Sequence, residues 1–152
     1  MKRFVDSELL KWKESINKKP LLIRGARQVG KTYSVRQLAK SFDYFMEVNF
    51  ESDRSVHRFF KKNFDPDEIS LNLSAYYNVP IKDGQTLLFL DEVQACPDAI
   101  SSLRFFYEKR PGLHVIAAGS LLEFALQELP SFGVGRIDNL FMFPLSFDNF
   151  LS

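Results

Sequence analysis

Cysteine is nearly absent from this sequence, and so are other features that would place it in several classes of protein. Cys96 is the single cysteine among 152 residues, so neither an internal disulfide nor a metal site built from several cysteines can form. The chain also lacks a large excess of charge of either sign, because it has 20 basic and 19 acidic residues, for a net charge of +1. No global basic field therefore argues for nucleic-acid binding, although a local basic patch is left open.

A long apolar segment is absent from the start of the chain. Residues 1–4 include two basic side chains, and Asp6, Glu8 and Lys11 follow with no apolar core between them. A secretory signal peptide and a membrane-spanning helix both need such a core, so we expect a cytoplasmic protein that does not bind a membrane. The composition that remains, 45% hydrophobic and 26% charged residues, is typical of one compact domain.

The most informative segment is the octet at residues 25–32, which fits the pattern G-x-x-x-x-G-K-[ST] of phosphate-binding loops, also called Walker A. Apolar residues 21–23 precede it and apolar residues at helical spacing follow it, so the loop lies between a strand and a helix. In that setting backbone N–H groups surround phosphate oxygens at the positive end of the helix. Lys31 would reach the β- and γ-phosphates, and the Thr32 hydroxyl would ligate magnesium. We expect the nucleotide to contact the loop and the residue after it: Gly25, Ala26, Arg27, Gln28, Val29, Gly30, Lys31, Thr32 and Tyr33.

A second motif consists of four apolar residues, Leu87–Leu90, followed by Asp91 and Glu92. A strand that is apolar on both faces lies in the middle of a helix-covered parallel sheet, and ligands of such sheets bind beyond the carboxyl ends of the strands. Because neighbouring strand residues point to opposite sides, we expect the two acids to divide their roles. Asp91 would hold magnesium, and Glu92 would polarise the attacking water.

The order of the other elements predicts an α/β protein. Strands are expected at 21–23, 44–50, 87–90, 114–118 and 140–145, and helical segments at 56–60, 66–77, 98–110 and 121–126, with an amphipathic segment before the first strand. Strands that alternate with helices indicate a parallel sheet with right-handed crossovers. A last apolar stripe at 147–151 stops at the end of the chain. This stripe indicates either that residues 1–152 form one core domain cut from a longer protein or that the stripe packs on another chain.

Four segments together resemble the AAA-type P-loop ATP-binding proteins of bacteria and archaea. They are the octet, residues 87–94, residues 117–120, and Gly135-Arg136 followed by 143–147. The resemblance implies a three-layer sandwich with helices on both faces of a parallel five-stranded sheet of strand order 5-1-4-3-2. It also implies that a C-terminal domain of unknown function usually follows the ATPase core. This architecture favours the interpretation that residues 1–152 are cut from a longer protein.

Two further site residues follow from this resemblance. Ser120 lies where related ATPases place a polar sensor of the γ-phosphate, although Ser is equally suited to cap a following helix. Arg136 lies where they carry an arginine that stabilises the transferring phosphoryl group, often on a neighbouring subunit; a solvated surface arginine is the competing interpretation. Asn49 could hold Glu92 in an inactive setting, but a turn residue at the strand end is the favoured interpretation.

These observations predict a magnesium-dependent ATPase that drives conformational change in an attached domain or partner. Lys31, Glu92, Ser120 and Arg136 would carry catalysis, and Thr32 with Asp91 would bind the metal. A slow-turnover, ATP-gated switch that binds a protein or DNA partner is the alternative, and a homo-oligomer is left open. A guanine nucleotide is disfavoured because the chain lacks an Asx-Lys-x-Asp motif, and a small-molecule kinase because no arginine-rich lid is recognisable.

Overall fold

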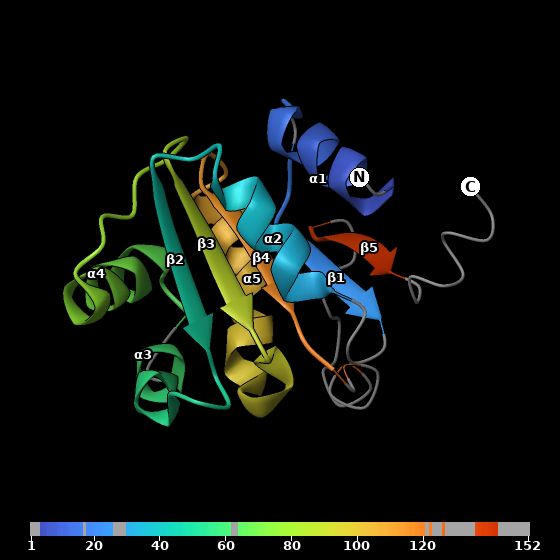
Figure 1. Cartoon of the computed structure of the whole chain (residues 1–152). Helices are drawn as coiled ribbons and strands as arrows, with labels where there is room; N and C mark the ends of the chain where they lie inside the picture. Colours follow the sequence, from blue (N-terminus) through green and yellow to red (C-terminus); the bar gives the residue numbers. More distant parts are fainter. Residues whose placement is uncertain are drawn as a thin grey trace.

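The computed structural model describes residues 4–16, 18–25, 30–61, 64–120, 122, 126 and 136–142. Five parallel strands form one sheet in the order β2-β3-β4-β1-β5 (Figure 1). This is the predicted order read from the other edge, so that prediction is confirmed. The strands are β1 (Leu21–Gly25), β2 (Tyr44–Asn49), β3 (Thr86–Asp91), β4 (His114–Ala118) and β5 (Asp138–Met142).

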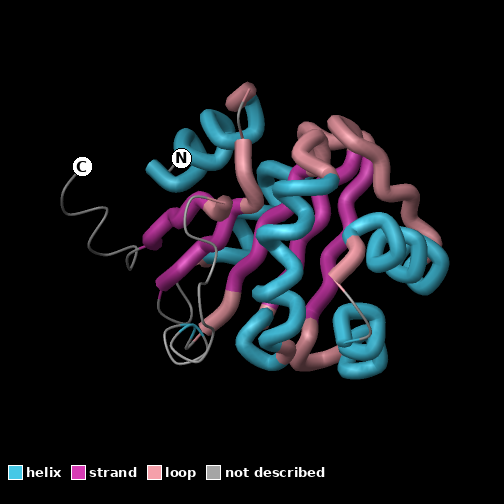
Figure 2. Tube along the Cα trace, turned by 180° about the vertical axis from the view of Figure 1, so that it is seen from behind, coloured by secondary structure: helices cyan, strands magenta, loops and turns pink. Residues whose placement is uncertain are grey.

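Helices cover both faces of the sheet, as predicted. In Figure 1, α2 lies in front of the sheet and α5 lies behind it, and Figure 2 shows the same layers from the other side. The helices are α1 (Phe4–Glu14), α2 (Lys31–Ala39), α3 (Arg58–Lys61), α4 (Pro66–Tyr77) and α5 (Pro97–Lys109). Two short 3-10 turns, η1 (Arg54–His57) and η2 (Val93–Ala95), complete the described elements.

The two layers produce two hydrophobic cores, because alternate residues of each strand point to opposite faces of the sheet. Leu87 and Phe89 of β3 pack with residues of α1 and α2, whereas Leu88 and Leu90 pack with residues of α3, α4 and α5. All six residues of β3 and all five of β4 are buried. Such strands belong in the middle of the sheet, where the sequence pattern had placed β3.

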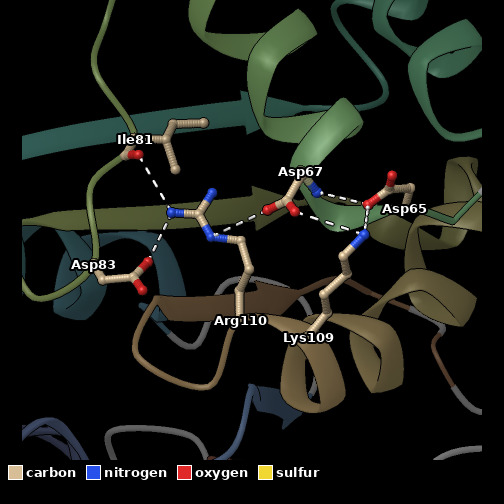
Figure 3. A network of polar contacts seen from close by, with 6 residues as sticks. All are labelled: Asp65, Asp67, Ile81, Asp83, Lys109 and Arg110. Carbon is tan, nitrogen blue, oxygen red and sulfur yellow. Dashed lines mark hydrogen bonds and ion pairs between the residues drawn. The ribbon is translucent and has the colours of Figure 1, made fainter.

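The edge of the sheet at which the strands begin is fastened by ion pairs between helices (Figure 3). Asp65 caps α4, accepting a hydrogen bond from the backbone of Asp67 at 3.0 Å, and also accepts one from Lys109 Nζ at 2.8 Å. Arg110 Nη2 donates to Asp83 at 2.7 Å. These contacts join the start of α4, the end of α5 and the turn before β3. The ends of three separate elements are thereby held at one place.

Some predicted boundaries differ from the structure. β5 begins two residues before the predicted Leu140, because the alternating polar positions of an edge strand carry a weak apolar signal. The helical stretch predicted at 56–60 divides into the turn η1 and the single helical turn α3. The predicted strand end at 143–145 and the apolar stripe at 147–151 lie outside the described residues, as does nearly all of the predicted helix at 121–126.

His114, at the start of β4, links the sheet to α1. It is 6% exposed, and its Nε2 atom lies 3.1 Å from the carbonyl oxygen of Lys13, which requires the proton on Nε2. The rings of Trp12 and Phe42 meet the imidazole edge to face. Nδ1 has no hydrogen-bond partner among the described residues, so its protonation would leave an unpaired N–H in an apolar site.

We expect this histidine to make the fold sensitive to acid. Burial lowers the pKa of His114, so below about pH 6.5 the unfolded chain binds more protons than the folded chain. Stability is then fully present above that pH and is lost as the pH falls toward the lowered pKa of the folded state. The urea midpoint of the wild-type protein should decrease more between pH 7.5 and 5.5 than that of His114→Phe. Equal decreases in the two proteins would contradict this role.

Candidate functional site

Three neighbouring strands, β3, β4 and β1, end at the same edge of the sheet, which is the lower edge in Figure 1. The residues at these ends are Asp91 on β3, Gly25 on β1, and Ser120, two residues after β4. Helix α2 begins at the same edge. The sheet topology therefore gathers the two sequence motifs at one place, as ligand sites of open α/β sheets require.

The contact between the two motifs is direct. The Thr32 hydroxyl Oγ1 donates a hydrogen bond to Asp91 Oδ2 over 3.2 Å, although the residues are 59 positions apart in the chain. Thr32 stands in the first turn of α2, which begins after Gly30. Gly30 has a φ of 82°, a left-handed conformation that is open to glycine and strained for other residues. A hydroxyl and a carboxylate thus face one another where the loop turns into the helix.

Lys31 is also directed back toward the loop. Its Nζ atom donates to the carbonyl oxygen of Gly25 at 3.2 Å, and the residue is 8% exposed. The ammonium group and the N-terminus of α2 are both positive, so this place favours an anion. The loop residues between them, Ala26, Arg27, Gln28 and Val29, lie outside the described residues, and their assigned nucleotide contacts remain expectations.

Asp91 is a buried carboxylate with a raised pKa. The residue is 5% exposed, and burial is the main cause of the increase, opposed by hydrogen bonds from the Glu92 backbone and the Thr32 hydroxyl. A buried carboxylate is stabilised in its ionised form by a cation beside it. Protons and a divalent cation would therefore compete at this position.

Glu92 departs from the sequence-based expectation. Its backbone is left-handed, with φ 55° and ψ 45°, because β3 ends at Asp91 and the chain turns at once into η2. The alternation of strand side chains therefore does not extend to Glu92, and strand geometry does not account for a division of roles between the two acids, which stays a prediction. A non-glycine residue in this conformation costs about 1–2 kcal/mol, and such strain concentrates at functional sites. The Glu92 N–H donates to Asp91 Oδ1 at 2.8 Å, which helps to hold the turn.

Gln94 is a site residue for which no sequence motif predicted a role. Its Nε2 atom donates to Glu92 Oε2 at 2.8 Å and reaches Ser120 Oγ at 3.4 Å. Ser120 is buried, at 4% exposed. Through its contacts with Glu92 and Ser120, the Gln94 amide links the ends of β3 and β4. The one available signal in the sequence was a polar residue three positions after Asp91, in the short segment between the predicted strand and the helix predicted at 98–110.

Asn49, at the end of β2, has the role of a turn residue. Its Oδ1 atom accepts hydrogen bonds from the backbone N–H groups of Glu51 and Ser52 at 2.9 and 3.1 Å. This confirms the favoured interpretation.

Arg136 lies at the side of the sheet where the strands begin, opposite the side where Thr32 and Asp91 lie. β5 runs parallel to β1, with Asp138 beside Leu21 and Met142 beside Gly25, so Arg136 precedes the start of both strands. The strand from Leu21 to Gly25 spans about 13 Å at roughly 3.3 Å per residue. The Arg136 side chain pairs instead with Glu108, near the end of α5, at 2.7 Å. In this structure Arg136 therefore lies away from the Thr32–Asp91 site of its own chain. A surface arginine and a role on the nucleotide of a neighbouring subunit are the two interpretations that agree with this placement.

Tyr33 lines a cavity of about 340 Å³ between α1 and α2. It is 59% exposed and lies directly after the Thr32 position, so the cavity opens beside the start of α2. The lining residues come from both helices and from the turn after α2: Asp6, Leu9, Leu10, Tyr33, Ser34, Gln37, Leu38 and Ser41.

The donor set at the carboxyl edge fits a metal that takes few protein ligands. Across the described part of the chain, no group of three or more His, Cys, Asp and Glu side chains gathers as a metal site. One hydroxyl and one carboxylate, 3.2 Å apart, suit Mg²⁺, which retains water and takes further ligands from substrate phosphates.

The parallel sheet, the helix that begins behind Gly30 and the Thr32–Asp91 contact define a P-loop nucleotide-binding domain. Residues 17–151 match the family described as AAA domain, and the chain belongs to that family. It is an AAA-type P-loop ATPase domain.

A solved structure of unliganded Pif1 from Bacteroides sp is similar, with 15% identity and a TM-score of 0.48. The similarity covers 93% of this chain and 41% of that chain, so the present chain spans less than half of that protein's length. No curated protein matches the sequence. None of the helices in the described residues is long and apolar enough to cross a membrane.

Proposed function

We propose that the domain hydrolyses ATP with magnesium and that hydrolysis drives a conformational change in an attached domain or partner. The observation that carries this proposal is the 3.2 Å contact between Thr32 and Asp91, with Lys31 and Glu92 directly beside them in the chain. The hydroxyl, the carboxylate, the ammonium group and the second acid are the groups that phosphoryl transfer requires.

Catalysis of this reaction rests on positioning and on charge neutralisation. Lys31 and the N-terminus of α2 would neutralise the β- and γ-phosphates. Thr32 and Asp91 would hold magnesium, which would supply charge neutralisation when it is bound. Glu92 would orient the attacking water and accept its proton, and Ser120 would contact the γ-phosphate from the end of β4. Tyr33 would contact the nucleotide from the mouth of the adjoining cavity.

Two measurements on the intact protein test the proposal. The first is a calorimetric titration with ATP, and the second is steady-state phosphate release, each with magnesium and with EDTA. Binding together with magnesium-dependent release is the expected result. Binding without release would instead support the ATP-gated switch. A protein that does not bind ATP under either condition would contradict both functions.

We further propose that Arg136 acts on the nucleotide of a neighbouring subunit. Arg136→Ala should then lower turnover by about 10³-fold and leave ATP affinity nearly unchanged, because the guanidinium stabilises charge in the transition state. Mixing Arg136→Ala with Glu92→Gln should restore part of the activity, since the second variant supplies the arginine to the intact site of the first. Arg58→Ala, at an exposed arginine of α3, is the matched control. Mixtures that recover no activity would contradict a role between subunits.

A further inference from the structure

The side-chain amide of Gln94 contacts three residues from three different segments. Its Nε2 atom donates to Glu92 Oε2 at 2.8 Å, and lies 3.4 Å from Ser120 Oγ and 3.5 Å from Glu51 Oε2. The contact with Glu92 is the shortest of the three and joins an amide to a carboxylate. Gln94 follows Glu92 by two positions in the turn η2, so the two side chains are carried by one short, ordered segment.

The other half of the same amide fixes its orientation. Oε1 of Gln94 is buried and has no hydrogen-bond partner in the described parts of the chain. It lies against Gly119, where a methyl group would collide with it and would also stand 3.2 Å from the backbone nitrogen of Val93. Exchanging the amide nitrogen and oxygen would place two oxygens together at Glu92. The amide is therefore oriented with its nitrogen toward the Glu92 carboxylate and its oxygen toward Gly119, although this leaves the oxygen without a hydrogen bond.

Glu92 is consequently held at two points. Its backbone N–H is bonded to Asp91 Oδ1, which fixes the left-handed turn, and its carboxylate is bonded to Gln94, which fixes the side chain. Without the second contact, the partly exposed Glu92 side chain would regain its rotamer freedom. A general base must lie within hydrogen-bond reach of the water whose proton it accepts, so this freedom bears directly on turnover.

We infer that Gln94 is a positioning residue that holds the Glu92 carboxylate for the attacking water and ties it to Ser120, and that Gly119 is glycine because the amide needs that space. This inference rests on the proposed ATP hydrolysis. Gln94 acts through Glu92 and contributes no group of its own to the reaction.

The primary test is Gln94→Ala in the intact protein. We expect kcat for ATP hydrolysis to fall by about 10- to 100-fold, because a displaced catalytic group costs that much, whereas KM should change less than about twofold. Gln85→Ala, which removes the same amide from an exposed turn at the other edge of the sheet, is the control and should leave both constants unchanged. An unchanged kcat for Gln94→Ala would overturn the inference.

A double-mutant cycle shows whether Gln94 acts through Glu92. In single-turnover measurements, Gln94→Ala should add no further loss to Glu92→Gln, because no carboxylate is left to position. Multiplied losses would show that Gln94 has a separate role and would overturn the inference.

Gly119→Ala supplies a second, independent variant. The added methyl group displaces the Gln94 amide, so kcat should fall about as far as in Gln94→Ala. The same methyl group should have a much smaller effect in the Gln94→Ala background, because the amide is gone and the milder contact with the Val93 backbone nitrogen, at 3.2 Å, is what remains. Additive losses in that background would contradict the packing argument.

The failure of this inference differs from the failure of the proposed function. If the wild-type protein binds ATP and loses turnover in Glu92→Gln but not in Gln94→Ala, the inference is wrong and the proposed function stands. If wild-type turnover is absent, or is equal to that of Glu92→Gln, the proposed function is wrong and the inference falls with it.

Discussion

Glu92→Gln should lower kcat for ATP hydrolysis by about 10²- to 10⁴-fold, the contribution usual for a positioned general base. The substitution keeps the size of the side chain and removes only the basic oxygen. Gln94 can still donate to the remaining oxygen of the new amide, so the turn after β3 should be preserved. ATP affinity in magnesium should therefore stay within about threefold of the wild-type value.

Phosphate release and calorimetric titration on the same protein preparation check this expectation. Glu14→Gln, at the exposed end of α1, is a matched control that should leave both quantities unchanged. Loss of turnover with retained binding is the result that assigns Glu92 to the chemical step. Equal, low turnover in both proteins would instead remove hydrolysis from the proposed function.

Lys31→Ala should weaken ATP binding by about 100-fold or more, a change of roughly 2.7 kcal/mol. The ammonium group is largely buried beside the Gly25 carbonyl, at the start of α2. Without it, the phosphates would face only the partial charge of the helix terminus. Charge-assisted contacts to phosphate are among the strong hydrogen bonds of proteins, which is why one side chain has so large an effect.

The matched control for Lys31 stands on the same helix. Lys40 is exposed and caps the other end of α2, where its Nζ atom donates to Gln37. Lys40→Ala should bind ATP as the wild-type protein does. A titration of Lys31→Ala that still released the wild-type heat would show that the nucleotide binds elsewhere.

The layout of the fold was predictable because its signals are local. The four apolar residues of β3 and the apolar run of β1 are short and buried on both faces. The Asp83-Gly84 and Pro111-Gly112 turns mark the places before which β3 and β4 cannot begin. The spatial order of the strands was a different matter. It followed from the resemblance to AAA-type proteins, because strand pairing is a long-range property that alternation alone does not determine.

The finer geometry of the site was not predictable from pattern. The change from strand to turn at Glu92 depends on one residue with a left-handed backbone, and glutamate does not predict that conformation as glycine does. The roles of Gln94 and Gly119 depend on the contact between them, which joins the ends of two different strands and leaves no local signal in the sequence. Arg136 had the right sequence position for the family but lies at the far edge of the sheet, since position along a chain does not say which edge a loop occupies.

The placement of Arg136 has a consequence for assembly. If this arginine serves a neighbour, the edge where the strands begin in one subunit must face the edge where they end in the next. Two different surfaces then meet, in a head-to-tail contact that repeats from subunit to subunit. Repeated contacts of this kind close into a ring when the rotation between subunits allows it, and extend into a filament when it does not. The Glu108 carboxylate, which holds Arg136 within one subunit at 2.7 Å, would release it as each such contact forms.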